Sequence, residues 1–258
     1  MLENKVREAV RNNIIGSWNV ARLADKYGCS DFVMVSTDKA VNPGNIMGAT
    51  KRVAEIICQT LDERSTTRFI TTRFGNVLGS AGSVVPLFRK QIQRGGPVTV
   101  TDRNITRYFM TISEACRLIL QTTVMGSGGE IFVLDMGEPV KILYLAEQMI
   151  RLSGKIPGED IKIEFTGLRP GEKLHEELFH TDENLTDTSH EKIMLALSRK
   201  TDWQTLAESM DKFRQAVDEF DIDEIMALIK KLVPEMTQQN TGERQNTDTT
   251  IRTYTAGE

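Results

Sequence analysis

Residues 32–51 decide the fold of this chain and read Phe32-Val33-Met34-Val35-Ser36-Thr37-Asp38-Lys39-Ala40-Val41-Asn42-Pro43-Gly44-Asn45-Ile46-Met47-Gly48-Ala49-Thr50-Lys51. The first five residues form a short apolar run with β-branched members, which is typical of a strand buried on both faces of a parallel sheet. A polar turn follows, and residues 49–64 then repeat apolar side chains at helical spacing. Strand, turn and helix in this order predict an α/β fold.

The same alternation continues on both sides of this stretch. Further helices are expected over residues 3–27, 84–94, 113–124 and 141–153, and further strands over 67–73, 98–101, 130–134 and 161–165. One or two surface-packed helices are expected over 207–231, where charged and apolar residues interleave. Helices that alternate with buried strands predict a doubly wound, mostly parallel sheet, followed by a smaller C-terminal α/β lobe.

Composition excludes several classes of function. The chain has 258 residues, of which 40% are hydrophobic and 26% charged, so it can bury a large core as one broad domain or two modest ones. A net charge of -4 provides no field that would gather nucleic acid. No apolar run approaches the roughly 18 residues of a membrane span, so a cytoplasmic location is expected. Neither the three cysteines nor the three histidines have metal-ligand spacing, and we expect reduced thiols and no metal site.

Asp38 and Lys39 are the first candidates for chemistry. An adjacent acid and amine can divide the two halves of a proton transfer. An isolated Asp-Lys pair more often belongs to a solvated turn, here the turn before Pro43. The position directly after a buried strand favours the functional interpretation, because the carboxyl ends of parallel strands face the ligand crevice in an open α/β sheet.

Met47 and Lys51 are the second candidates. Their four-residue step places both on one face of the same helix. Taken alone, Met47 is more simply interpreted as a core methionine. The combination Ser-Thr-Asp-Lys, Asn-Pro and Met-Gly-Ala-x-Lys resembles the active-site stretch of the extended short-chain dehydrogenases, in which a Tyr-x-x-x-Lys pair stands where this chain has Met47 and Lys51. In that superfamily it is similar to the bacterial UDP-N-acetylglucosamine 4,6-dehydratases of polysaccharide biosynthesis, where Met commonly replaces the Tyr.

The resemblance implies a proton-transfer set and a cofactor set. The implied catalytic residues are Thr37, Asp38, Lys39, Met47 and Lys51, and the implied cofactor contacts are Ser36 and Lys51. Asp38 would protonate the departing C6 hydroxyl, Lys39 would be the base at C5, and Lys51 would bind the nicotinamide ribose of NAD. Thr37 would hold the C4 hydroxyl. Because a thioether cannot ionise, the C4 proton is left to Thr37, Asp38 or water.

The resemblance also implies a set of substrate contacts. Residues 72–80 resemble the family's Arg-x-x-Asn-Val-x-Gly segment, and residues 167–177 contain a distinctive Arg-Pro-Gly-Glu-Lys-Leu-His-Glu run. The implied substrate-binding residues are Arg73, Asn76, Val84, Pro86, Arg107, Arg169 and Glu172. Val84 and Pro86 would flank the uracil, although packing at the start of a helix explains them equally well. Arg107 and Arg169 would bind the diphosphate and Glu172 the ribose, against the alternative of an ion-paired surface turn.

The domain expectations follow from the same likeness, which covers residue 1 to about residue 182 and corresponds to the C-terminal half of such an enzyme. Residues 1–125 would form the C-terminal part of a Rossmann-like NAD-binding domain with interleaved segments of the substrate lobe. Residues 126–236 would form mainly the nucleotide-sugar lobe and a helical extension, and residues 237–258 a disordered tail. No glycine-rich fingerprint precedes residue 32, so we expect weak NAD binding and an exposed sheet edge at residues 32–36.

Three functions remain open at this stage. The first is a UDP-N-acetylglucosamine 4,6-dehydratase that uses NAD and a UDP-sugar, truncated at the N-terminus. The second is a UDP-sugar 4-epimerase, against which the Asp38-Lys39 pair argues. The third is a catalytically inactive UDP-sugar-binding fragment. A homo-oligomer or a separate N-terminal half are the expected protein partners.

Overall fold

The computed structural model describes residues 5–80, 82–179, 183–197 and 201–236, which form two compact units. Unit 1 takes its described residues from Met1–Gly75, Glu114–Asp135 and Glu177–Gln238, and unit 2 from Asn76–Ser113 and Met136–Glu176. The chain passes back and forth between the units, so the boundary expected at residue 125 does not coincide with them. The expected tail, residues 237–258, lies outside the described residues.

Unit 1 is built on a five-stranded sheet in the order β1-β2-β7-β11-β10. Its strands are β1 (Asp31–Val35), β2 (Arg68–Arg73), β7 (Ile131–Leu134), β10 (Asn184–Asp187) and β11 (Ile193–Leu197). The pairs β1–β2 and β2–β7 are parallel, as the buried apolar runs predict, and β1 is at one end of the described sheet, where an edge was expected. The antiparallel hairpin of β10 and β11 was not expected.

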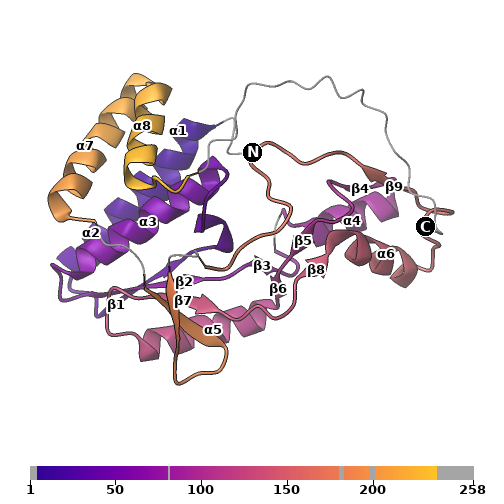
Figure 1. The fold of residues 1–258 in the computed structure, drawn as a ribbon, viewed down its shortest axis with the longest axis horizontal. Coiled ribbons are helices and arrows are strands. Elements are labelled where there is room, and N and C mark those ends of the chain that lie inside the picture. The colour runs from indigo at the N-terminus through magenta and orange to yellow at the C-terminus, as the bar shows by residue number, and fades with distance from the viewer. Residues whose placement is uncertain (1–4, 81, 180–182, 198–200, 237–258) are drawn as a thin grey trace. The chain divides into compact units, whose positions relative to one another are not determined.

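Helices cover both faces of this sheet (Figure 1). On one face are α1 (Val6–Ala9), the π-helical turn η2 (Val10–Ile15), α2 (Gly16–Lys26), α3 (Ile46–Asp62), α7 (Trp203–Glu219) and α8 (Ile222–Leu232), and on the other is α5 (Ile112–Met125). Phe69 of β2 belongs to the core on the α3 face, whereas the hydroxyl of Thr72 meets Thr122 of α5, as the alternation of side chains along a strand requires.

The C-terminal helices α7 and α8 belong to unit 1, although they were expected next to the nucleotide-sugar lobe. They pack against α1, η2 and α3, with Trp203 stacked on Trp18 at 5.7 Å between ring centroids. Their buried residues, among them Phe213 and Ile229, join the largest apolar cluster of the unit. The hairpin of α7 and α8 therefore covers the helix that carries Met47 and Lys51.

Unit 2 is a smaller α/β lobe. It pairs β3 (Asn76–Val77) with β6 (Phe109–Met110), β4 (Val98–Val100) with β9 (Ile163–Phe165), and β5 (Thr106–Arg107) with β8 (Val140–Lys141). Helices α4 (Val84–Gln93) and α6 (Ile142–Leu152) pack on these strands around a core that includes Phe88, Ile105 and Ile150. The expected strands over 98–101 and 161–165 thus pair with each other.

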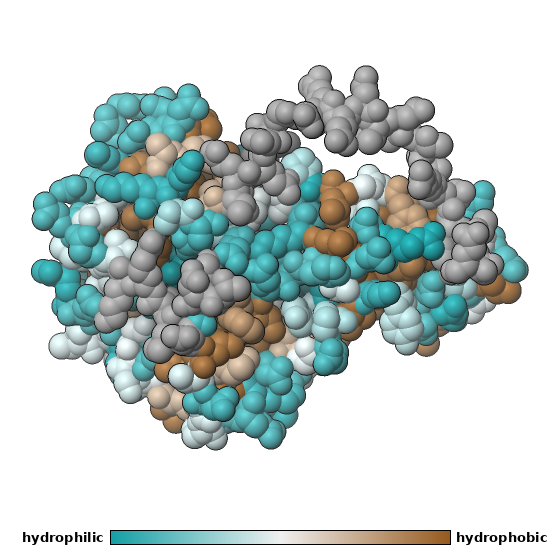
Figure 2. Space-filling view, viewed as in Figure 1, coloured by the Kyte–Doolittle hydropathy of each residue, from teal (hydrophilic) through white to brown (hydrophobic). Residues whose placement is uncertain are grey.

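The surface is mostly polar on the face shown in Figure 2, where apolar residues appear in smaller groups between hydrophilic ones. Among the helices that the structure describes, none combines the length and the apolar character needed to cross a membrane.

Candidate active site

The turn after β1 carries the first predicted site residues. Strand pairing continues past the end of β1, because the Ser36 N–H donates to the Thr72 carbonyl at 2.8 Å and the Asp38 N–H to the Phe74 carbonyl at 3.1 Å. A single 3-10 turn, η3 (Asp38–Ala40), follows, and the Thr37 hydroxyl accepts from the Lys39 N–H at 3.4 Å. The turn therefore lies at the carboxyl ends of two parallel strands, where the sequence predicted it.

Asp38 is the centre of this turn and is only 1% exposed. Its Oδ1 accepts from the Thr37 hydroxyl at 2.8 Å and from Lys39 Nζ at 2.9 Å. Its Oδ2 is buried and has no hydrogen-bond partner within the described part of the chain. Buried carboxylate oxygens are rarely left without a donor. The turn thus combines an acid–amine pair with one buried acceptor that is left over.

Helix α3 supplies the second pair. The Asn45 side chain caps the helix by accepting from the Gly48 N–H at 2.8 Å, which fixes its first turn beside η3. Lys51 Nζ donates to the carbonyl of Val35, the last residue of β1, at 2.7 Å. Burial lowers the pKa of Lys51, and the charge of Glu55 opposes that shift. Met47 is half-buried one turn earlier.

Gly48 lets α3 touch the backbone of the turn. A Cβ at this position would lie 2.1 Å from the Lys39 carbonyl oxygen and 3.1 Å from Pro43 Cβ. We therefore expect Gly48→Ala to lower the free energy of unfolding by about 1–3 kcal/mol or more, as overpacking does. Urea unfolding of the chain measures this change.

Gly16→Ala is the matched control for that substitution. Gly16 begins α2 with helical φ and ψ, and its Cβ would meet only the Arg11 carbonyl oxygen at an ordinary 3.5 Å. Alanine at such a position is expected to be neutral or stabilising, by up to about 1 kcal/mol. Equal stability of the two variants would contradict the close approach of α3 and the turn.

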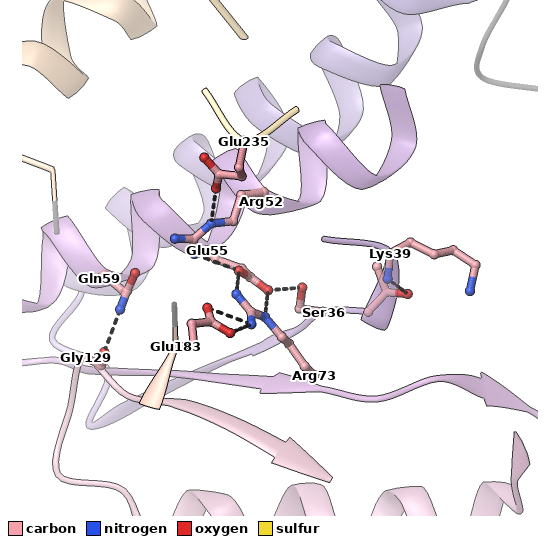
Figure 3. A network of polar contacts seen from close by, with 10 residues as sticks. Ser36, Lys39, Arg52, Glu55, Gln59, Arg73, Gly129, Glu183 and Glu235 are labelled. Atoms are coloured by element: carbon pink, nitrogen blue, oxygen red, sulfur yellow. Dashed lines mark hydrogen bonds and ion pairs between the residues drawn. The ribbon is translucent and has the colours of Figure 1, made fainter. Parts of the chain in front are cut away.

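A buried ionic network lies beside the turn, centred on Glu55 of α3 (Figure 3). Arg73, at the end of β2, binds Glu55 through two parallel bonds of 2.8 and 2.7 Å from Nε and Nη2. The Ser36 hydroxyl donates to the same carboxylate at 2.6 Å. Such two-pronged pairs are the strong form of charge-assisted hydrogen bonding.

Two further carboxylates complete the network from distant parts of the sequence. Glu183 accepts from Arg73 Nη1 at 2.7 Å, and Arg52 links Glu55 at 3.0 Å to Glu235 at 3.3 Å. Burial alone would raise the pKa of Glu55, but the charges and hydrogen bonds of Arg73, Arg52 and Ser36 lower it to about 2. Burial alone would lower the pKa of Arg73, but the charges and hydrogen bonds of Glu55 and Glu183 raise it.

Two residues predicted to contact ligands have their side chains in this network. Arg73, expected to bind substrate, is 1% exposed and directs its guanidinium to Glu55 and Glu183. Ser36, expected to bind the cofactor, is 4% exposed and donates its hydroxyl to Glu55. Both side chains serve the interior of unit 1, because buried charges require such partners.

Sequence reasoning did not identify the acidic residues that hold them. The signal was present only for Glu55, which is a carboxylate inside the otherwise apolar stretch 53–58 of α3 and follows Lys51 by one helical turn. Glu183 lies among polar residues, and Glu235 follows a proline after the last helix, so neither position gives a comparable signal.

Unit 2 brings together three of the predicted substrate residues. Arg107 on β5 donates to the Thr106 carbonyl at 2.7 Å and to Glu172 Oε1 at 3.1 Å, and its Nε lies 3.7 Å from Glu176. Glu172 Oε2 accepts from the backbone N–H of Arg169 at 3.2 Å, while the Arg169 residue as a whole is exposed. The residues predicted to bind the nucleotide are thus the same ones that form the ion-paired turn.

The remaining predicted substrate residues are placed separately within unit 2. Asn76 is half-buried on β3 and pairs through its backbone with the Tyr108 carbonyl at 3.0 Å. Val84 packs against the unit 2 core at the start of α4, and Pro86 is half-buried in the same turn. The packing expectation for Val84 is therefore observed.

Within the described part of the chain, no group of three or more His, Cys, Asp and Glu side chains is placed to hold a metal ion. The three cysteines are free, and burial raises the pKa of the Cys58 thiol to about 12. His175 Nδ1 is hydrogen-bonded to the Thr106 hydroxyl at 2.8 Å.

Comparison with known proteins gives consistent matches. The family described as polysaccharide biosynthesis protein matches residues 1–198. The chain is 60% identical over 194 residues to the capsular polysaccharide biosynthesis protein CapD of Staphylococcus aureus, a match that covers 75% of the chain and 32% of CapD. It is 36% identical over 182 residues to the UDP-N-acetylglucosamine 4,6-dehydratase (inverting) of Campylobacter jejuni, covering 69% of the chain and 52% of that enzyme.

Two further matches bear on fold and reaction. The chain is 35% identical over 179 residues to the UDP-glucose 4-epimerase of Rickettsia canadensis, covering 68% of the chain and 51% of that enzyme. The X-ray structure of Pen from Bacillus thuringiensis superimposes with a TM-score of 0.71 at 36% identity, covering 78% of this chain and 63% of that chain. The chain spans only about a third to a half of the length of these curated relatives.

Proposed function

The chain belongs to the polysaccharide biosynthesis protein family, and on that premise we propose that it carries the proton-transfer and nucleotide-binding residues of a UDP-N-acetylglucosamine 4,6-dehydratase. One observation carries this proposal. In the turn after β1, Lys39 Nζ lies 2.9 Å from Asp38 Oδ1, and Asp38 Oδ2 is buried without a partner among the described residues. An acid and a base joined by a hydrogen bond suit the removal of a proton and a hydroxyl from neighbouring carbons.

The pair balances the elimination of water. When the proton of the Lys39 ammonium passes along the 2.9 Å bond to Asp38, the result is a neutral amine and a carboxylic acid. Lys39 then takes the proton from C5, the C6–O bond breaks, and Asp38 protonates the departing hydroxyl. One water leaves, and the pair returns to its ionic form.

Thr37 and Met47 bear on the C4 hydroxyl. The Thr37 hydroxyl, 2.8 Å from Asp38 Oδ1, would hold the C4 hydroxyl beside the pair. Met47 has no ionisable group, so the C4 proton must pass to Thr37, Asp38 or water.

NAD, when bound, would supply the hydride chemistry of this reaction. Lys51 fits the nicotinamide ribose, because its Nζ is fixed on the last carbonyl of β1 next to the turn. The sequence upstream of β1 contains no glycine-rich turn to cradle the pyrophosphate. The residues present thus fit the nicotinamide end of the cofactor and leave the adenosine end without its usual donors.

Unit 2 supplies the nucleotide contacts in this proposal. The exposed Arg169 and the partly exposed carboxylate of Glu172 would bind diphosphate and ribose. Arg107 is already paired with Glu172 and Glu176. A phosphate that binds Arg107 would therefore take the place of Glu172, and Glu172 would bind the ribose instead. Asn76, Val84 and Pro86 remain proposed contacts to the sugar and the uracil.

A UDP-sugar 4-epimerase is the second candidate, because relatives of both kinds match at similar identity. An epimerase returns the hydride to C4 and removes no hydroxyl at C6, so it has no use for an acid such as Asp38 next to a base. The Asp38–Lys39 pair therefore favours the dehydratase.

Mass spectrometry distinguishes these functions directly. The purified chain is incubated with UDP-N-acetylglucosamine and NAD, and the nucleotide sugars are then separated and weighed. A product lighter by one water supports the dehydratase, and an isomer of unchanged mass overturns it in favour of the epimerase. An unchanged substrate would overturn both reactions for the chain by itself.

The two ligands are also expected to differ in affinity. Because unit 2 contains Arg107, Arg169 and Glu172 whereas the sequence has no glycine-rich cradle, the chain should bind UDP measurably and NAD more weakly or not at all. Calorimetric titration of the chain with each ligand measures both dissociation constants. Tighter binding of NAD than of UDP would contradict the assignment.

A further inference from the structure

Helix α3 is attached to the sheet through a polar column. Lys51, Glu55 and Gln59 follow one another at steps of four residues, so they share one face of the helix. Lys51 Nζ donates to the Val35 carbonyl. Glu55 accepts from Ser36 and Arg73, and Gln59 Nε2 donates to the Gly129 carbonyl at 3.3 Å (Figure 3). The face of α3 that packs on the sheet therefore carries polar side chains, which are hydrogen-bonded to residues at or next to the ends of β1, β2 and β7.

Ser36 is the point where this column reaches the turn. It separates β1 from Thr37, is 4% exposed, and is fixed twice, by its N–H on the Thr72 carbonyl and by its hydroxyl on Glu55. Because Glu55 keeps its charge, with its pKa lowered to about 2, the hydroxyl of Ser36 has a permanent acceptor. A buried hydrogen bond to a charged group restrains the residue that starts the turn.

The network also reaches the C-terminal hairpin, α7 and α8 with the residues that follow to Met236. Glu235 binds Arg52, and Arg52 binds Glu55. The family match ends at residue 198, so Glu235 lies beyond it. A contact outside the matched range thus joins the network that holds Ser36.

We propose that Ser36 and Glu55 are positioning residues, which keep Asp38 and Lys39 in the geometry observed in the turn. Glu235 of the C-terminal hairpin stabilises the same network through Arg52. The proposal rests on the proposed function for the role of the Asp38–Lys39 pair. It assigns Ser36 no contact with substrate or cofactor.

The test is the pH profile with which an amine-acylating reagent labels Lys39, followed by peptide mass spectrometry on the full chain. Ser36→Ala removes the link to the turn and leaves every charge in place. If loss of a hydrogen bond to a charged group loosens the turn by a comparable free energy, Lys39 should be labelled about tenfold faster in Ser36→Ala. Other lysines of the same chain serve as internal references.

Ser209→Ala is the matched control. Ser209 is 1% exposed and donates its hydroxyl to the Thr205 carbonyl at 2.6 Å within α7, away from the turn. Each variant removes one buried hydroxyl, but only Ser36→Ala should change the Lys39 profile. An unchanged profile in Ser36→Ala, or the same change in Ser209→Ala, overturns the positioning role.

Glu235→Gln tests the hairpin, with the exposed Glu219→Gln of α7 as its control. A weaker, partly exposed ion pair predicts about a twofold rise in Lys39 labelling for Glu235→Gln alone. No difference between these two variants overturns the role of the hairpin. Labelling requires no turnover, so a failed water-loss assay would remove the proposed reaction and leave the positioning result standing.

Discussion

Glu55→Gln is expected to lower the free energy of unfolding by about 3–5 kcal/mol, because removing one partner of a buried ion pair leaves the other charge uncompensated. Among the described residues, Arg73 would keep Glu183 alone as a charged partner while it remains 1% exposed. The amide would also turn its NH₂ group toward guanidinium donors. Urea unfolding of the wild-type and variant chains at neutral pH measures the loss.

The same substitution should change how stability depends on pH. The pKa of Glu55 is depressed in the folded chain, from 4.5 to about 2, so its contribution is fully present above the unfolded value. It is lost progressively as the pH falls from about 4.5 through about 2. Glu55→Gln should therefore show a flatter fall in stability across this window.

An exposed glutamate provides the control. Glu208 of α7 is exposed and is hydrogen-bonded only to Gln204 by the bonds described, so Glu208→Gln should alter neither neutral-pH stability nor its acid dependence by more than about 0.5 kcal/mol. Parallel pH curves for wild type and Glu55→Gln would contradict the buried charge network.

Lys39→Ala should abolish most of the proposed dehydration, with kcat reduced by about 10² to 10⁴-fold, since this is what a positioned acid or base contributes. The loss should appear in kcat with little change in KM, because the base acts in the transition state and adds little ground-state binding. The measurement is the rate of water loss from UDP-N-acetylglucosamine in a preparation that turns over.

Met47→Leu is the matched variant on the other predicted residue. A thioether transfers no proton, and a volume-conserving apolar exchange usually costs under about 1.5 kcal/mol, so turnover should be nearly retained. If a folded Met47→Leu chain lost as much activity as Lys39→Ala, proton transfer would have to be assigned away from the Thr37–Asp38–Lys39 turn.

Local pattern in the sequence was sufficient for the main helices, for the parallel strands of the sheet and for the turn. The apolar run at Phe32–Ser36, the helical spacing after Asn45 and the Arg-Pro-Gly-Glu run each carry their signal within a few residues, and the structure has a strand, a helix and an ion-paired turn at these places. Short-range periodicity fixes these features because it reflects which face of each element is buried.

Only the tertiary structure decided which polar side chains are buried and bonded to one another. Arg73 lies in a motif that suggests a ligand contact, yet Glu55 and Glu183, 18 and 110 residues away, take up its guanidinium. Whether a charge is desolvated depends on partners brought together by folding, and no local pattern around Glu183 or Glu235 records that meeting. The sequence by itself thus determined where the turn and its acid–amine pair lie, whereas long-range packing decided which charges hold that turn.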